Sequence, residues 1–256
     1  MGKVVAITNQ KGGVGKTTTC INLACALKNT GRKALLCDMD PQGNATSGSG
    51  VEKTKILPTM YDVLIRGTPA ADAIVRTSYF DVLPSNQSLS GAGVELVGAE
   101  NRAHVLRDAL APLSGQYDVT LIDCPPSLEM LTLNALCAAD SVLIPVQCEY
   151  FALEGIADLI STMRMIKREM NTGIEIEGVL LTMYDARTNF SAQVAAEIKK
   201  YFKNKVYTVS IPRNVRISEA PSHGMPVMAY ERNSRGAQAY NDFCAEFIKR
   251  VEKNPR

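Results

Sequence analysis

Lys11–Thr18 reads Lys-Gly-Gly-Val-Gly-Lys-Thr-Thr and closely follows Lys3–Thr8, which reads Lys-Val-Val-Ala-Ile-Thr. The β-branched residues of the earlier stretch are typical of a buried strand, and Thr17–Leu27 continues with the apolar spacing of a helix. Glycines between a strand and a helix allow successive backbone N–H groups to turn toward phosphate oxygens at the positive end of the helix. The pattern therefore predicts a phosphate-binding loop in an α/β fold.

The side chains of this loop have distinct predicted roles. Lys16 is expected to reach the β- and γ-phosphates of a nucleotide, and the Thr17 hydroxyl is expected to hold Mg²⁺. An ordinary P-loop would have glycine at position 10, whereas this chain has Gln10 followed by Lys11. A lysine at the start of the loop is badly placed to wrap its own nucleotide but well placed to point outward, toward a second copy of the chain. The predicted nucleotide contacts in the loop are Lys11, Gly12, Gly13, Val14, Gly15, Lys16, Thr17 and Thr18.

Carboxylates follow two further apolar stretches. Lys33–Asp38 reads as a strand and is followed by Asp40, and Tyr117–Asp123 reads as a strand that ends in an acid. Because the carboxyl ends of parallel strands face the ligand crevice, Asp38, Asp40 and Asp123 are expected to converge on the phosphate site. Asp123 is then expected to act on Mg²⁺ through the water shell of the ion, since Mg²⁺ gives up its waters reluctantly.

Four longer segments carry a resemblance to a known family. They are Asp38–Thr46, Asp123–Ser127, Pro145–Gly155 and Ile211–Gly224. Together with Lys11, they resemble the deviant Walker A ATPases of the ParA/MinD superfamily, and most closely the chromosomal ParA proteins, which are also called Soj. The resemblance runs from Gly2 to about Lys249.

The resemblance implies a slow, Mg²⁺-dependent ATPase that serves chromosome or plasmid partitioning. In this family two subunits dimerise with ATP, and the lysine at the start of the loop touches the nucleotide of the partner subunit. The dimer binds double-stranded DNA non-specifically, and a ParB-type centromere-binding protein stimulates the hydrolysis that resets it. By resemblance the catalytic residues are Lys11, Lys16, Asp40 and Asp123, and the metal contacts are Thr17, Asp40 and Asp123.

The nucleobase is expected near the later strands. In relatives the purine is held by residues that follow the strands corresponding here to 174–183 and 206–210. This places Met183, Pro212 and Asn214 near the base, although Pro212 could equally be a structural turn residue after a strand.

Positive charge is concentrated toward the C-terminus. The chain has a net charge of only +2, but from residue 199 onward it has 12 Lys and Arg against 5 Asp and Glu. Such an asymmetry indicates an acidic partner surface, which in the ParA setting is DNA bound through its phosphates. The candidate DNA contacts are Arg187, Lys199, Lys200 and Arg216. The alternative is that these charges only solvate an outer face of the protein.

The order of the predicted elements favours one domain over residues 1–256. Strands are expected near 3–8, 33–38, 79–83, 117–123, 140–146, 174–183 and 206–210, with helices between most of them. This alternation predicts a single doubly wound, mainly parallel sheet with helices on both faces, of the P-loop NTPase type. No Pro/Ser-rich linker or repeat divides the chain.

Composition limits the location and the chemistry. The sequence has no signal-peptide pattern and no apolar run long enough to span a membrane, so we expect a cytoplasmic, nucleoid-associated protein without a membrane partner. The seven cysteines are odd in number and form no Cys-x-x-Cys pair. They are expected to be buried free thiols and not metal ligands or disulfides.

Three other functions remain open. A MinD-type division-site ATPase would bind membrane through a C-terminal amphipathic helix, and Ala237–Val251 is amphipathic. We expect that stretch to pack on the sheet instead, because the chain ends in a polar segment. An iron–sulfur reductase would need paired cysteines that bridge a dimer, and a metabolic P-loop enzyme would show ATP turnover that depends on a small acid.

Overall fold

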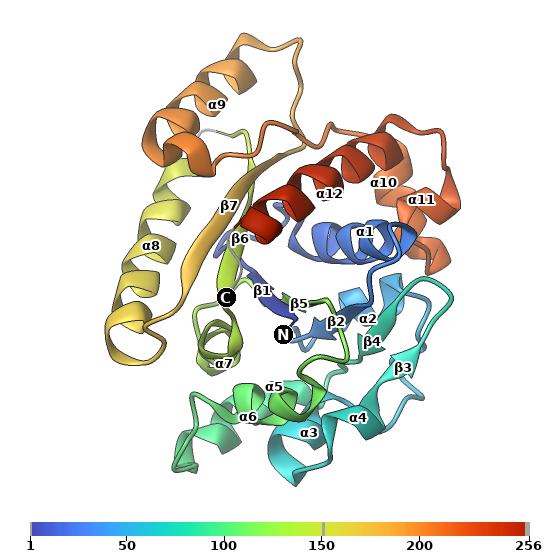
Figure 1. Cartoon of the computed structure of the whole chain (residues 1–256), viewed down its shortest axis with the longest axis vertical. Helices are drawn as coiled ribbons and strands as arrows, with labels where there is room; N and C mark the ends of the chain where they lie inside the picture. The colour runs from blue at the N-terminus through green and yellow to red at the C-terminus, as the bar shows by residue number, and fades with distance from the viewer. Residues whose placement is uncertain (1, 150–151, 254–256) are drawn as a thin grey trace.

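Seven strands form one sheet in the order β3-β4-β2-β5-β1-β6-β7 (Figure 1). The computed structural model describes residues 2–149 and 152–253. The strands are β1 (Lys3–Ile7), β2 (Ala34–Asp38), β3 (Val75–Arg76), β4 (Asp81–Leu83), β5 (Val119–Asp123), β6 (Ser141–Gln147) and β7 (Glu175–Thr182). All neighbours pair in parallel except β3 with β4, a short antiparallel edge that the sequence did not predict. The predicted doubly wound, mainly parallel fold is confirmed.

Helices cover both faces of this sheet (Figure 1). They are α1 (Lys16–Asn29), α2 (Asn44–Gly48), α3 (Met60–Arg66), α4 (Ala70–Ala73), α5 (Leu89–Glu95), α6 (Val105–Leu110), α7 (Met130–Ala138), α8 (Ala152–Glu169), α9 (Asn189–Phe202), α10 (Val215–Glu219), α11 (Val227–Tyr230) and α12 (Arg235–Lys253). Helices α1, α11 and α12 lie on one face, and α3, α5, α6, α7 and α8 lie on the other.

Successive residues of the central strands contribute to two separate hydrophobic cores. In β1, Ala6 belongs to the core under α7, whereas Val5 and Ile7 belong to the core under α1 and α12. In β2, Leu35 and Leu36 divide in the same way. Since helices cover both faces, these strands are apolar on both sides, which explains their unbroken apolar sequence.

The predicted strand 206–210 is wrong. The segment lies beside β7, to which Tyr207 donates its backbone N–H at 2.9 Å, but it makes only isolated bridges. The backbone N–H groups of Thr208 and Val209 instead donate to the carboxylate of Glu246 on α12, at 3.0 and 3.1 Å. A helix side chain therefore takes the place of further strand pairing, a contact that local sequence does not reveal.

The amphipathic stretch Ala237–Val251 lies within α12, which packs against α1. Its large apolar side chains Tyr240, Phe243 and Phe247 are buried in the core beneath it. The apolar face of this helix is therefore covered by the protein itself, as predicted.

The cysteines also lie where they were predicted. All seven are buried and free. Among the residues that the structure describes, no helix is long and apolar enough to cross a membrane.

Candidate functional site

A cavity of about 650 Å³ lies at the carboxyl edge of the sheet, where the P-loop enters α1. It is lined by Gly12, Gly13, Gly15, Lys16, Thr17, Thr18, Asp40, Pro41, Gln42, Asn44, Gln87, Ser90, Pro126 and Met183. The loops after β1, β2, β4, β5 and β7 thus all contribute to one wall. The volume is that of a small-molecule site, and its position is where open α/β sheets bind ligands.

The P-loop is held in shape by its glycines and by hydrogen bonds to its neighbours. Gly13 and Gly15 have φ angles of +74° and +89°, in the left-handed region that favours glycine. The hydroxyl of Thr182, at the end of β7, donates to the backbone oxygen of Val14 at 2.8 Å. The backbone N–H of Thr19 donates to the Gly15 oxygen at 2.9 Å, which continues α1 from the loop. The loop is therefore held between two strands and one helix.

Lys16 is only 8% exposed, at the floor of this cavity. Its ammonium donates to the backbone oxygen of Lys11 at 3.1 Å. Burial lowers the pKa of Lys16, while the nearby Asp123 acts in the opposite direction. A buried cation that faces a cavity favours an anionic ligand, because the ligand replaces the water that the cation has lost.

Thr17 and Asp123, two of the predicted metal contacts, meet at one corner of the site. The Thr17 hydroxyl donates to Asp123 Oδ2 at 2.7 Å, and Asp123 is fully buried. Burial, followed by the charge of Asp38, raises the pKa of Asp123 to about 8. A neighbouring cation would favour the ionised carboxylate.

The oxygen atoms at this corner fit Mg²⁺. In the described part of the chain, no three His, Cys, Asp or Glu side chains gather so as to hold a metal by themselves. Mg²⁺ typically takes one or two protein oxygens and completes its shell with phosphates and water. The Thr17 hydroxyl and Asp123 carboxylate supply such a partial set beside the P-loop.

Asp40 and Asp38 have different positions, although the sequence placed both at the phosphate site. Asp40 lines the cavity, and its Oδ1 accepts the backbone N–H of Gln42 at 2.9 Å. Asp38 is instead fully buried, and its Oδ2 accepts both the backbone N–H and the hydroxyl of Thr46, at 2.8 and 2.7 Å. Asp38 therefore holds the loop that carries Asp40, and the expectation that it faces the crevice was wrong.

The side chain of Lys11 does not line the nucleotide cavity. Its ammonium forms an ion pair with Glu149 at 2.7 Å, and Gln147 also donates to that carboxylate. The Lys11 side chain is 32% exposed and that of Glu149 is 46% exposed. The lysine is therefore held at the surface by its own chain, in a place from which it could reach another molecule. Sequence reasoning included Glu149 in the segment Pro145–Gly155 but did not identify this role.

The three nucleobase candidates lie in neighbouring loops. Met183 lines the cavity and has a φ of +49°, which is unusual for a residue other than glycine. Pro212 forms a parallel bridge with Tyr184. The Asn214 side chain accepts the backbone N–H of Arg216 at 3.0 Å and so caps α10. Met183 is thus the candidate that the structure brings to the cavity wall.

Both candidate DNA-binding arginines are exposed and paired with a carboxylate. The side chain of Arg187 is 89% exposed and donates to both oxygens of Asp185, at 2.9 and 2.8 Å. Hydrogen bonds from Arg187 lower the pKa of Asp185 to about 2. Arg216 pairs with Glu219 at 2.8 Å. Each arginine would therefore have to exchange a carboxylate for a phosphate on binding DNA, which the sequence did not indicate.

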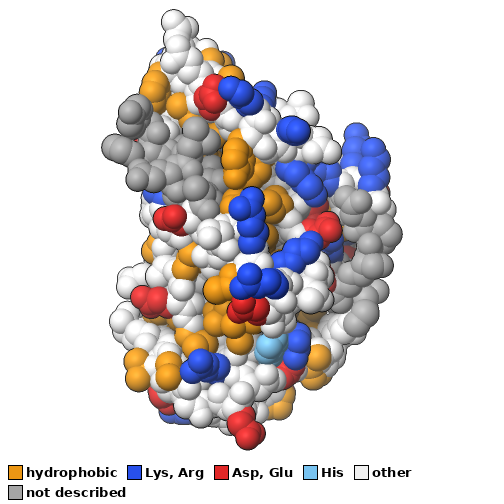
Figure 2. Space-filling model, turned by 90° about the vertical axis from the view of Figure 1, so that its left-hand side faces the viewer, with side chains coloured by type: hydrophobic (Ala, Val, Ile, Leu, Met, Phe, Trp, Pro, Cys, Tyr) orange, Lys and Arg blue, Asp and Glu red, His pale blue; other side chains and the backbone are white. Residues whose placement is uncertain are grey.

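The lysine candidates lie in the last turn of α9. Lys200 is 3.9 Å from the carboxylate of Glu197, and Lys199 is exposed. Figure 2 shows the side of the molecule on which α8 and α9 lie, with Lys and Arg side chains spread down it among hydrophobic ones. Positive charge on this side is therefore dispersed along a face and not confined to one helix.

Four other cavity residues were not predicted from the sequence to belong to the site. Gln87 and Ser90 lie after β4, in a polar stretch that resembles an ordinary turn. Gln42 and Asn44 were part of the resemblance but were assigned no role. These residues reach the cavity only because the strands before them lie side by side in the sheet.

Comparisons with known proteins match this geometry. A family model described as an AAA domain matches residues 2–176. The chain is 54% identical over 248 residues to the sporulation initiation inhibitor protein Soj of Bacillus subtilis (strain 168), across 96% of this chain and 98% of that protein. It is 50% identical over 259 residues to the chromosome partitioning protein ParA of Myxococcus xanthus (strain DK1622), across 100% and 92%.

The chain belongs to the ParA/Soj family of chromosome-partitioning ATPases. These two matches confirm the family that the sequence motifs predicted. They cover almost the whole chain, including the part beyond residue 176.

Solved structures agree with this family fold. The cobyrinic acid a,c-diamide synthase of Mycobacterium smegmatis, with bound ADP and magnesium, has a TM-score of 0.87 and 36% identity, and covers 100% of this chain and 97% of that one. The septum site-determining protein MinD of Pyrococcus horikoshii, complexed with Mg-ADP, has a TM-score of 0.79 and 27% identity, with 97% of each chain covered. The MinD match is less identical than the Soj and ParA matches, which favours partitioning over the division-site alternative.

Proposed function

We propose that the chain is an ATP-driven switch for chromosome or plasmid partitioning, with residues 1–256 acting as one ATPase domain. The observation that carries this proposal is the separation of two lysines on one P-loop. Lys16 is buried at the cavity floor, whereas Lys11 lies outside on Glu149. One lysine is available for the subunit's own nucleotide and the other for the nucleotide of a partner.

The residues around the cavity divide the chemistry of ATP hydrolysis. Lys16 and the P-loop N–H groups bind the phosphates, and Lys16 stabilises the negative charge of the transferred phosphoryl group. Asp40, whose loop is held by Asp38, orients the attacking water. Thr17 and Asp123 would hold Mg²⁺, which would supply positive charge against the phosphates. Catalysis by this set depends mainly on positioning and charge.

Dimerisation couples the nucleotide to the oligomeric state. The Lys11 ammonium would leave Glu149 and bind the phosphates of the nucleotide in the second subunit, which carries more negative charge than one carboxylate. A symmetric dimer makes this exchange twice, so ATP stabilises the pair. Hydrolysis weakens both contacts and returns the subunits to monomers.

DNA binding would follow from the dimer. Two copies of the surface with Arg187, Lys199, Lys200 and Arg216 then act together, and the second copy binds at high effective concentration. The contacts are to phosphates, so no base preference is expected. Such binding would associate the ATP form with the nucleoid, and a ParB-type partner would stimulate hydrolysis there.

Co-sedimentation with DNA or with liposomes tests this function. The protein is mixed with non-specific duplex DNA or with anionic liposomes, in the presence of Mg-ATP, Mg-ADP or no nucleotide. We expect binding to DNA with Mg-ATP only, and no binding to liposomes, because the apolar face of α12 is buried in the core.

Two results would contradict the proposal. Liposome binding with ATP would favour the MinD-type alternative. ATP turnover that is indifferent to DNA and depends on a small acid would favour a metabolic enzyme, such as the synthase named among the structural neighbours.

A further inference from the structure

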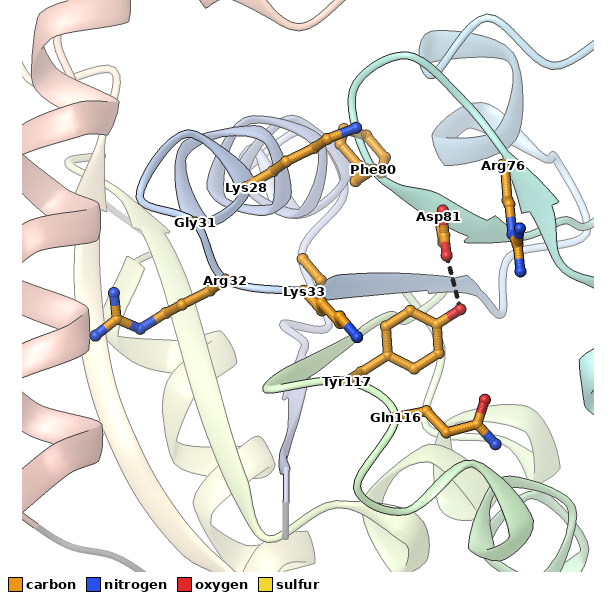
Figure 3. A pocket seen from close by; sticks show the side chains of 10 residues that line it. Lys28, Gly31, Arg32, Lys33, Arg76, Phe80, Asp81, Gln116 and Tyr117 are labelled. Carbon is orange, nitrogen blue, oxygen red and sulfur yellow. Dashed lines mark hydrogen bonds between the residues drawn. The ribbon is translucent and has the colours of Figure 1, made fainter.

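A second cavity of about 650 Å³ opens at the amino edge of the sheet, at the opposite end of α1 from the P-loop (Figure 3). It lies where β2 and β4 begin and where the chain enters β5. Its charged lining residues are Lys28, Arg32, Lys33, Arg76 and Asp81. Four cations therefore surround a hollow that has one carboxylate, far from the nucleotide site.

Two of these cations already have partners. The Lys28 ammonium donates to the backbone oxygen of Ser78 at 3.0 Å. Arg32 turns away from the cavity toward α12, where it pairs with Glu252 at 2.6 Å (Figure 3). Lys28 and Arg32 line the cavity, but some of their N–H donors are already bonded to the protein and are not free for a ligand.

The other two cations are unpaired in the part of the chain that the structure describes. Lys33 and Arg76 are exposed, and neither side chain makes an ion pair or a hydrogen bond with a described residue. Arg76 lies directly opposite Asp81 in the β3–β4 pair, where an ion pair would be expected. Asp81 instead accepts the hydroxyl of Tyr117 at 2.8 Å. The carboxylate is therefore directed to the phenol, and Arg76 keeps its donors.

Tyr117 lines the cavity and lies between Lys33 and Arg76 (Figure 3). Burial and the hydrogen bond to Asp81 raise the pKa of this phenol, so it stays neutral and keeps donating its one proton to Asp81. The buried ring of Phe80 adds an apolar part to the lining, and the Gln116 amide adds a polar group. The cavity thus combines unpaired cations with a shaped, partly apolar wall.

We propose that this cavity binds a small molecule that carries two or more phosphate groups. Guanidinium and ammonium groups that lack carboxylate partners are the usual receptors for phosphate oxygens. A ligand with several phosphate groups offers more charge and more oxygens to share between Lys33 and Arg76 than a single carboxylate does. The cavity is open to solvent, and its volume is that of small-molecule sites, whereas a duplex needs an extended surface.

Calorimetric titration with inorganic pyrophosphate tests the proposal. The protein is first loaded with Mg-ADP and freed of excess nucleotide, so that the P-loop is filled. We expect one saturable site per chain, with affinity at least about tenfold above that for inorganic phosphate, because two cations can act on pyrophosphate. The doubly substituted variant Lys33→Glu, Arg76→Glu should bind pyrophosphate at least about tenfold more weakly.

A charge-matched variant provides the control. Lys167→Glu with Arg168→Glu makes the same change in net charge at the end of α8, on the far side of the sheet. It should leave pyrophosphate binding unchanged. Because both substituted positions of the test variant are exposed, it should fold, and the neutral variant Lys33→Ala, Arg76→Ala should show a smaller loss in the same direction.

Three results would overturn the proposal. They are no saturable binding of pyrophosphate up to about 10 mM, equal losses in the test and control variants, and equal affinities for phosphate and pyrophosphate. If the test variant loses DNA binding while no pyrophosphate site is found, the cavity belongs to a nucleic-acid surface instead. None of these results bears on ATP-dependent dimerisation.

Discussion

Thr46→Val should destabilise the protein strongly, because the Thr46 hydroxyl links the segments that follow β2 and β4, and both segments line the nucleotide cavity. The hydroxyl donates to Asp38 at 2.7 Å and accepts the backbone N–H of Ser85 at 2.8 Å. Thr46, Asp38 and Ser85 are all fully buried. Ser85 in turn donates its own hydroxyl to the backbone oxygen of Asp40 at 2.8 Å. Removing one oxygen atom therefore breaks a chain of contacts that ends at the catalytic loop.

Valine has nearly the shape of threonine, so packing should be kept while the hydrogen bonds are lost. A hydrogen bond to a charged group contributes about 1.5–3 kcal/mol, and a buried N–H left without a partner costs about 1–3 kcal/mol. The sum predicts a loss of about 2.5–6 kcal/mol in the free energy of unfolding. For a chain of this size, each kcal/mol lowers Tm by about 2–4 °C, so a decrease of roughly 5–24 °C is expected.

Thermal and urea unfolding followed by circular dichroism measure this loss. Thr46→Ser is the matched control, because it keeps the hydroxyl and removes one buried methyl group, at a cost of about 1 kcal/mol. If the two variants are equally stable, the hydroxyl network does not hold the loop as described. A loss of ATP turnover in Thr46→Val below its Tm would further link Asp38 and Thr46 to the placement of Asp40.

Four other substitutions have expected outcomes. Asp40→Ala should keep ATP binding but lose most turnover, so that the ATP dimer persists on size-exclusion chromatography. Arg187→Glu or Arg216→Glu should weaken DNA binding and spare dimerisation. If the dimer neutralises roughly four phosphates, the slope of log K against log salt is about −3.6 for the unchanged protein, and each variant should flatten it by about 2. Asp185→Asn should instead tighten DNA binding, because it frees Arg187 from its carboxylate.

Each of these outcomes can be contradicted by a simple result. Normal turnover in Asp40→Ala would remove that carboxylate from the mechanism. Unchanged affinity and salt slope in both arginine variants would place the DNA surface elsewhere. Weaker DNA binding in Asp185→Asn would mean that Asp185 positions Arg187 for DNA and does not compete with the phosphates.

Sequence patterns predicted the parts of the fold and site that depend on local order. The P-loop follows the buried strand β1 and begins a helix. Asp123 ends the neighbouring strand β5, and Asp40 follows β2, the next strand across the sheet. These positions follow from one rule, that parallel strands present their carboxyl ends at one edge. The amphipathic spacing of Ala237–Val251 likewise predicted a helix with one buried face.

Contacts between distant segments could not be predicted in this way. Lys11 and Glu149 are 138 residues apart, and nothing local to either indicates the ion pair. The sequence 206–210 has strand composition, but Glu246 on α12 takes its backbone donors. Asp38 and Asp40 look equivalent at the end of β2, and only the burial of Thr46 beside Asp38 separates their roles. Such differences arise from packing and not from propensity.

The oligomeric state of two lysine variants tests the trans role of Lys11 most directly. Sedimentation velocity with Mg-ATP and with Mg-ADP is compared for Lys11→Ala, Lys16→Ala and the unchanged protein, alongside ATP binding by calorimetry. We expect Lys16→Ala to lose ATP binding itself, whereas Lys11→Ala should bind ATP as a monomer and fail to form the dimer that the unchanged protein forms with ATP. An ATP-dependent dimer of normal affinity in Lys11→Ala would contradict the assignment of this lysine to the partner's nucleotide.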